Sequence, residues 1–324
     1  MRSLIRHPQA QSPGDEAVAQ IVRDSFPSYF TPIPPNWTVR PPQKMCYAVY
    51  SQEPGGPPLK IVAAYIQHPQ AAVRVLQRME NGTYSVAVDF RPDQYNFGGG
   101  SGCTIELLDM NGDGKKDVSV SFEPLNNGPT VDWYFRWDTN QLWNWLPNRA
   151  GAGEPIDAGL PNTIALDLQH DGRLEIISLG QVPADSNVSV SHYVYRLGEG
   201  VYFLDREIAS YFLFVRNSGE AAKESHPFTL IAPPAGDYVM KLVNGDRGGA
   251  NRVTGAQILL NGSPIAGTDF VNGQVEFRTA TVTLVQSNLL EVTVFGPTGA
   301  KLYGTIEPSG SASAPSPAKA SAGR

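Results

Sequence analysis

Oxygen-bearing side chains recur at alternate positions of one short segment, Asp109-Met-Asn-Gly-Asp-Gly-Lys-Lys-Asp117. They stand at loop positions 1, 3, 5 and 9: Asp109, Asn111, Asp113 and Asp117. Gly114 occupies position 6, and the backbone carbonyl of Lys115 is available at position 7. A hard cation such as Ca²⁺ takes about six to eight oxygen ligands, and a tight turn of this composition supplies most of them. The segment predicts a Ca²⁺ site, with a solvated polar turn as the alternative.

The spacing is that of the first nine positions of an EF-hand loop, but the surroundings differ. Position 12 is Val120, so the bidentate glutamate of an EF-hand is missing. The flanking segments 105–108 and 118–122 have the composition of β-strands. We therefore expect the loop to join two strands of a β-hairpin.

A related segment, 167–175, follows one repeat later. It has acids at three of the ligand positions, a neutral amide at position 3 and a backbone carbonyl at position 7: Asp167, Gln169, Asp171, Arg173 and Glu175. This segment is either a second metal loop or a polar turn. His170 stands at position 4, where we expect its side chain to point to solvent. The corresponding segment of the first repeat, 52–60, has lost the acids and is expected to be only a turn.

An internal repeat positions these loops. Strand-like segments begin at Ile61, Val118 and Ile176, which are 57 and 58 residues apart. Each is followed by a strand that ends in arginine, a turn and an aromatic residue: Arg78 with Tyr84, Arg136 with Trp143, and Arg196 with Tyr202. Repeats of this length with about four strands each indicate propeller-like blades or a stacked β array.

The ends of the chain differ from the repeats. Residues 1–45 contain one helical candidate, Asp15 to Phe26, followed by a proline-rich extended stretch over 27–42. Residues 46–226 hold the repeats, and 227–307 contain six or seven short strands with Asn-Gly turns, typical of a small sandwich. Residues 308–324 have almost nothing to bury and should be a disordered tail. The predicted fold is all-β: three legible blades in a propeller-like array, then a β-sandwich.

The charge and the apolar runs exclude several function classes. The net charge is −6, with acids and bases mixed along the chain, which argues against nucleic acid or an anionic membrane surface as the main partner. No apolar run approaches the ~20 residues that a membrane helix needs, the longest being pieces such as Tyr211–Val215. The sequence leaves the oligomeric state open.

The two loops and the strands around them resemble FG-GAP/VCBS repeats, in which a D-x-N-x-D-G-x-x-D loop joins two strands of a propeller blade. The resemblance covers roughly residues 46 to 206. It implies an extracellular setting, calcium held by the loop, and roles in adhesion or ligand binding. The segment from Phe228 to Glu307 loosely resembles the Ig-like modules of bacterial surface proteins.

Aromatic residues concentrate in the segment 133–145. Alternation places Trp133, Phe135 and Trp137 on one face of a strand, and Trp143 and Trp145 share a face of the return strand. If exposed, these indoles could stack on sugar rings. In the alternative, they fill the space between adjacent sheets.

The sequence contains no convincing catalytic site. The five histidines show no HExxH pairing, and no nucleophile elbow or phosphate-binding loop is present. Glu154 and Asp157 could do acid/base work in a glycosidase or lyase, but a surface loop is the favoured interpretation of this pair. We therefore favour a non-enzymatic binding or adhesion module for a glycan or protein partner. The alternatives are a polysaccharide-active hydrolase or lyase, and a structural component of a surface complex.

The cysteines bear on the cellular compartment. Cys46 and Cys103 lie one repeat length apart, and equivalent positions of neighbouring repeats often meet in space, so we expect a disulfide. The first residues lack the apolar core of a signal peptide. We expect export through a leader missing from this chain, or by a route that uses none.

Overall fold

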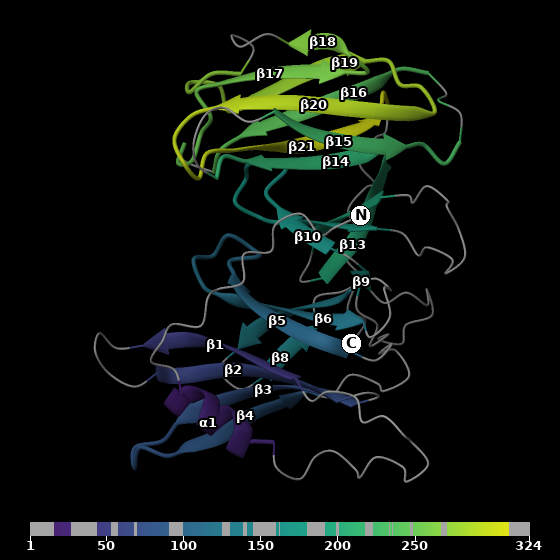
Figure 1. Ribbon diagram of the computed structural model, residues 1–324. Helices are drawn as coiled ribbons and strands as arrows, with labels where there is room; N and C mark the ends of the chain where they lie inside the picture. The colour runs from purple at the N-terminus through teal and green to yellow at the C-terminus, as the bar shows by residue number, and fades with distance from the viewer. Residues whose placement is uncertain are drawn as a thin grey trace, which may run out of the picture. The chain divides into compact units, whose positions relative to one another are not determined.

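The structure is a computed structural model that describes residues 16–26, 44–52, 58–67, 70–90, 100–124, 130–138, 141–144, 160–161, 163–179, 192–198, 201–217, 223–232, 234, 236–246, 249–266 and 271–310. The chain forms two compact units. The first comprises residues 1–109 and 114–162, and the second comprises 110–113 and 163–324. The described residues form twenty-one strands and one helix, which confirms the predicted all-β class (Figure 1).

Three antiparallel sheets follow one another along the chain, each with its strands in sequential order. The first contains β1(Lys44–Gln52), β2(Pro58–Gln67), β3(Gln70–Arg78) and β4(Tyr84–Phe90). The second contains β5(Gly100–Leu108), β6(Asp117–Pro124), β7(Val131–Asp138) and β8(Gln141–Asn144), with β9(Leu160–Pro161) paired to β7. The third contains β10(Thr163–Leu166), β11(Glu175–Leu179), β12(His192–Gly198) and β13(Val201–Ile208). These are the three predicted blades.

Strand β2 shows why the first sheet has apolar residues at successive positions. Alternate side chains of a strand point to opposite faces, and β2 is buried on both. Val62 and Ala64 pack with residues of the second sheet, including Val120 and Phe135. This core joins the first two sheets face to face within the first unit.

Helix α1(Glu16–Asp24) covers the opposite face of the first sheet (Figure 1). Val18 and Val22 are buried there, and the Phe26 ring stacks on Tyr65 with 5.1 Å between ring centroids. The Arg74 guanidinium lies 4.8 Å from the Phe26 ring centroid. The helix therefore occupies the sheet face on which another blade would pack.

A disulfide joins Cys46 on β1 to Cys103 on β5, with 5.8 Å between the Cα atoms. The bond links equivalent positions of the first and second sheets, as their separation of 57 residues predicted.

The C-terminal part is a β-sandwich of two four-stranded sheets (Figure 1). One has the order β14(Ser210–Val215), β21(Lys301–Pro308), β16(Tyr238–Asn244), β19(Phe277–Val282). The other has the order β15(Lys223–Thr229), β20(Ser287–Phe295), β17(Gly255–Leu260), β18(Ser263–Ala266). Because β14 pairs with β21, the sandwich begins at Ser210, upstream of the boundary at 227 that the sequence suggested.

The third sheet and the sandwich share one core within the second unit. Ile177 and Val194 of the third sheet pack with Val243 and Tyr303 of the sandwich. Arg206 on β13 also pairs with the buried Glu307 on β21 at 2.9 Å. The sandwich thus covers a face of the third sheet, as α1 covers a face of the first.

Several predicted features lie outside the described residues: the proline-rich stretch 27–42, residues 311–324 of the tail predicted over 308–324, Trp145, Glu154 and Asp157. Within the described part of the chain, no helix has the length and apolarity needed to span a membrane.

Candidate metal centre

Both predicted metal loops are hairpin turns at the same place in their sheets. The first loop, 109–117, connects β5 to β6, and the register pairs Leu108 with Asp117. The second loop, 167–175, connects β10 to β11, and the register pairs Leu166 with Glu175. The prediction of a β-hairpin loop in place of an EF-hand is confirmed.

The two loops share one backbone conformation. In each, the position-1 carboxylate accepts a hydrogen bond from the position-6 amide at 2.9 Å, Asp109 from Gly114 and Asp167 from Gly172. Position 6 has a positive φ in both, 83° at Gly114 and 90° at Gly172. Position 4 does as well, with 74° at Gly112 and 57° at His170. Glycine adopts this region without strain, and histidine is among the residues that tolerate it.

The polar side chains of the first loop turn toward one another. The Asn111 side-chain oxygen accepts from the Asp113 amide at 3.0 Å, and its side-chain nitrogen donates to the Asp113 carboxylate at 3.0 Å. Asp113 and Lys115 are exposed, whereas Asp117 is buried at the base of the hairpin. Positions 3 and 5 are therefore close together, as a shared ligand would require.

The second loop gathers three carboxylates around backbone amides. Asp167 accepts from the Asp171 amide at 3.0 Å, and Asp171 accepts from the Arg173 amide at 2.8 Å. Glu175 is buried and accepts from the Leu168 amide at 2.8 Å. Gln169 and Arg173 have exposed side chains.

The pKa values of Glu175 and Asp167 are raised in the second loop. The pKa of Glu175 is raised to about 8, chiefly by burial and also by the nearby carboxylates of Asp171 and Asp167, against the Leu168 hydrogen bond. Burial also raises the pKa of Asp167. Three like charges in one turn repel one another, and a cation at this place would remove that repulsion.

The donor set of both loops suits a hard cation. Carboxylate, amide and carbonyl oxygens are the ligands of Ca²⁺, and the one sulfur in the two loop sequences, the thioether of Met110, does not stand at a ligand position. Among the residues described, no group of three His, Cys, Asp or Glu side chains is already arranged to hold a metal. The first loop would use Asp109, Asn111, Asp113 and Asp117 with the Lys115 carbonyl, and so depends on an amide and a carbonyl as well.

Residues 110–113 of the first loop belong to the second unit. There, the Met110 carbonyl accepts from the Leu174 amide at 3.0 Å. Gly112 packs against Gly172 so closely that a Cβ at position 112 would lie 2.7 Å from the Gly172 carbonyl oxygen. Gly112 is therefore needed both for its positive φ and for this approach.

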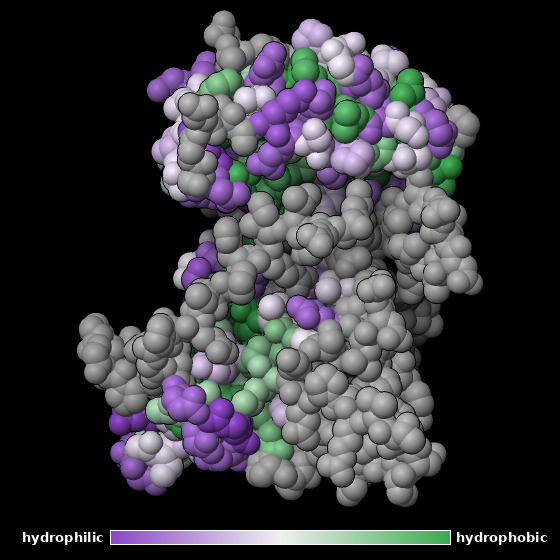
Figure 2. Space-filling view, in the orientation of Figure 1, coloured by the Kyte–Doolittle hydropathy of each residue, from purple (hydrophilic) through white to green (hydrophobic). Residues whose placement is uncertain are grey.

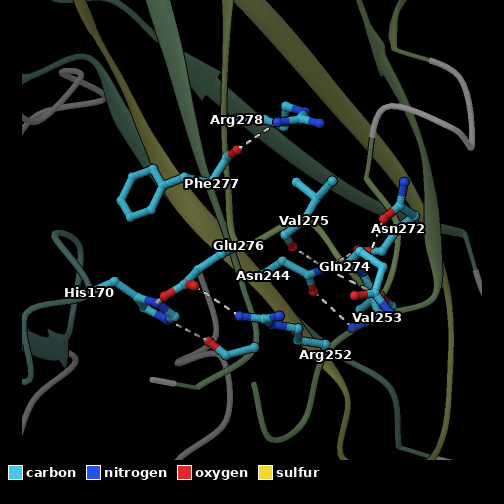
Figure 3. A network of polar contacts seen from close by, with 11 residues as sticks. His170, Asn244, Arg252, Val253, Asn272, Gln274, Val275, Glu276, Phe277 and Arg278 are labelled. Carbon is cyan, nitrogen blue, oxygen red and sulfur yellow. Dashed lines mark hydrogen bonds and ion pairs between the residues drawn. The ribbon is translucent and has the colours of Figure 1, made fainter. Parts of the chain in front are cut away.

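The expectation that His170 points to solvent is wrong. Its side chain is only 3% exposed, and its ring contacts the Glu276 carboxylate and the Gly245 carbonyl (Figure 3). The ring also meets Phe277 edge-on, with 6.1 Å between centroids. The sandwich covers position 4 of this loop, and no local pattern in the sequence could have shown that contact.

A buried asparagine supports the sandwich surface that meets His170. Asn244 donates from its side chain to the carbonyls of Val253, Asn272 and Val275, at 3.2, 3.0 and 3.0 Å (Figure 3). Its side-chain oxygen accepts from the Val253 amide at 2.8 Å. The only sequence signal here was the Asn244-Gly245 turn, which did not indicate this role.

The aromatic segment is divided between core and undescribed positions. Trp133 is fully buried and stacks parallel to Phe135, so it fills the space between sheets and is not free to stack on a sugar. Trp137 and Trp143 lie on β7 and β8, and Trp145 falls outside the described chain. The visible surface of the sandwich is largely hydrophilic with separate apolar residues (Figure 2).

Comparisons with known proteins give remote likenesses only. No protein-family model matches the chain, and no curated protein matches it. Among solved structures, a fructofuranosidase variant from Schwanniomyces occidentalis has 9% identity and a TM-score of 0.25, covering 80% of this chain and 69% of its own. An exo-beta-1,3-galactanase from Phanerochaete chrysosporium has 9% identity and a TM-score of 0.23, covering 76% and 78%.

A family 35 carbohydrate binding module from Clostridium thermocellum has 15% identity and a TM-score of 0.16, covering 44% of this chain and 95% of its own. At such identities and TM-scores, these likenesses carry no argument about what this chain binds or catalyses.

Proposed function

We propose that this protein is a calcium-structured binding or adhesion module of the FG-GAP/VCBS type, which acts outside the cytoplasm and recognises a glycan or protein partner. The observation that carries the proposal is the shared geometry of the two loops. Two oxygen-rich turns at equivalent places in successive sheets have the same positive φ values and the same hydrogen bond from position 6 to position 1. A repeated loop of this composition fits a repeated cation site.

The cation would have a structural role. The ligands in the second loop would be Asp167, Gln169, Asp171 and Glu175 with the Arg173 carbonyl. Bound Ca²⁺ would offset the repulsion among the carboxylates and fix each hairpin, on which the register of the next strand depends. The residues themselves orient the site through backbone hydrogen bonds that hold position 1 against position 6.

Two arguments support an extracellular or surface location. The disulfide between Cys46 and Cys103 fits an oxidising compartment. Open loops with incomplete ligand sets bind Ca²⁺ with dissociation constants of roughly 10⁻⁴ to 10⁻³ M, the range of extracellular modules. A protein with such loops would be calcium-loaded outside the cell and empty in the cytosol.

A glycan-array screen with calcium and with chelator tests the binding function. We expect retention of at least one glycan class that weakens in chelator, and Asp113→Ala should weaken it in the same way. The buried Trp133 is left out of the proposed binding face, whereas Trp137 and Trp143 stay candidates. Binding that is unchanged by chelator would contradict a calcium-structured site. If no glycan is retained, the protein partner becomes the candidate to pursue.

The same screen addresses the alternative of a polysaccharide-active hydrolase or lyase. Such an enzyme needs two carboxylates facing each other across a cleft. Release of shortened oligosaccharides from the retained glycans, lost at high pH or low pH as a carboxylate pair requires, would favour that alternative over a binding module.

A further inference from the structure

Docking residues alternate with the proposed ligands along the second loop. The side chains of Asp167, Gln169 and Asp171 are the proposed ligands at positions 1, 3 and 5. Between them, Leu168 and His170 point into the sandwich side of the second unit. Because both sets share one short backbone, the conformation that arranges the ligands is also the docked conformation.

The contacts from the sandwich reach positions 1, 2 and 4 of the loop. The Tyr303 hydroxyl donates to the Asp167 carbonyl at 3.0 Å, within the loop's first residue. Leu168 is buried in a core that includes Val243 and Tyr303. His170 closes the set through the Glu276 carboxylate and the Gly245 carbonyl.

The contacts of the second loop with the sandwich hold the backbone of position 4 at a positive φ, as a comparison of the two loops shows. Position 4 needs a positive φ in both, and the first loop meets that need with Gly112. The second loop places His170 there, and a side chain other than glycine is disfavoured in this region. The interactions of the imidazole with the sandwich therefore stabilise a backbone conformation that the loop would adopt less readily alone.

The surface that contacts His170 is hydrogen-bonded to the rest of the sandwich. We call residues 244–245 and 272–277 the sandwich rim. The Asn244 amide donates to the Glu276 carbonyl at 2.9 Å, and the Gly245 amide donates to the Lys301 carbonyl at 3.0 Å. Arg252 holds the second Glu276 oxygen at 3.0 Å. The contacts of His170 with Glu276 and with the Gly245 carbonyl therefore connect the loop directly to the rim (Figure 3).

We propose that the sandwich sets the cation affinity of the second loop through His170, and that cation binding there in turn orders the sandwich rim. The inference rests on the proposed function, because it requires the loop to bind Ca²⁺. Coupling between two sites is reciprocal, so the rim must respond to the ion as the ion responds to the rim. The first loop, with Gly112 at position 4, lacks this dependence on His170.

Hydrogen exchange measured by mass spectrometry on the full chain tests this coupling, with Ca²⁺ titrated from chelator to millimolar. Peptides covering 109–117, 167–175 and 271–278 report the first loop, the second loop and the rim. His170→Ala removes the docking side chain and keeps, at position 4, a residue for which the positive φ is disfavoured. Glu276→Gln removes the partner charge from the other side, and Gln274→Ala is the control, since its exposed side chain lies on the same rim.

In the wild type, we expect Ca²⁺ to protect both loops and the rim. In His170→Ala and Glu276→Gln, the calcium midpoint of the second loop should rise by about 5- to 150-fold, the usual span of such couplings, and rim protection should be lost. Among the described residues, the first loop contacts the second through Met110 and Gly112 and makes no contact through His170, so its midpoint should move less. In Gln274→Ala, all midpoints should stay the same. A wild-type rim that does not respond, or an unchanged second-loop midpoint in both variants, overturns the coupling and leaves the calcium loops standing. If neither loop is protected, the proposed function fails and the coupling with it.

Discussion

Acid should destabilise the second unit through His192 on β12. Its Nδ1 is enclosed and has no hydrogen-bond partner among the described residues, and its ring packs edge-on against Tyr211. Burial, with a smaller contribution from the neighbouring His226, lowers the pKa of His192 to about 4. Burial lowers the pKa of His226 as well.

The sign and size follow from linkage. The unfolded chain takes up a proton on His192 near its ordinary pKa of 6.5, whereas the folded protein resists protonation down to about pH 4. The contribution of His192 to stability is therefore complete above about pH 7, falls as the pH drops below 6.5, and levels off below about pH 4, whereas the raised pKa of Glu175 in the same unit acts in the opposite direction over this range. At about 1.4 kcal/mol for each pH unit, the loss at pH 5 is about 2 kcal/mol.

Urea denaturation at a series of pH values, followed with a probe in the second unit, measures this loss. His192→Gln keeps a polar side chain of similar reach but cannot titrate, so between pH 7 and pH 5 the wild type should lose about 2 kcal/mol relative to this variant. The two proteins compared above pH 7, where His192 does not titrate, give the baseline. A decline in His192→Gln as steep as in the wild type would refute the assignment to this histidine.

Three further changes test the packing. Phe26→Ala removes the ring that follows α1 and stacks on Tyr65. Denaturant unfolding should show that the first unit loses about 3–5 kcal/mol of its free energy of unfolding. A loss below about 1 kcal/mol would mean that this packing does not stabilise the first sheet. Replacing both Cys46 and Cys103 by serine should cost that unit about 2–5 kcal/mol, and free thiols in the native protein would contradict the bond. Asn244→Leu leaves buried backbone groups of the rim without their hydrogen bonds, each at a cost of about 1–3 kcal/mol in the free energy of unfolding. A variant as stable as the wild type would refute the role of Asn244 in holding the rim together.

Local signals in the sequence predicted the elements that depend on neighbouring residues. The apolar spacing from Asp15 to Phe26 predicted a helix, and α1 spans Glu16–Asp24. The Asn261-Gly262 turn predicted a hairpin, and both residues have the positive φ that such a turn needs between β17 and β18. Alternation placed Trp133 with Phe135 on one face, and that face is the core.

Features that depend on distant pairing could not be predicted in this way. Tyr211–Val215 was visible as an apolar run, but its partner strand β21 lies far along the chain, so the start of the sandwich was missed. The buried position of His170 follows from Glu276 and Gly245, which no pattern in the loop encodes. Loop composition indicates possible ligands, whereas the side chains that support the loop come from tertiary packing.

Thermal unfolding in millimolar calcium and in chelator tests the central claim most directly. An ion that binds the folded loops and not the unfolded chain stabilises by about 2.7 kcal/mol at a hundredfold excess over Kd. We predict a higher Tm in calcium, with most of the increase lost in Asp113→Ala and less of it lost in Asp171→Ala. Identical curves for the wild type in calcium and in chelator would mean that both loops are only polar turns.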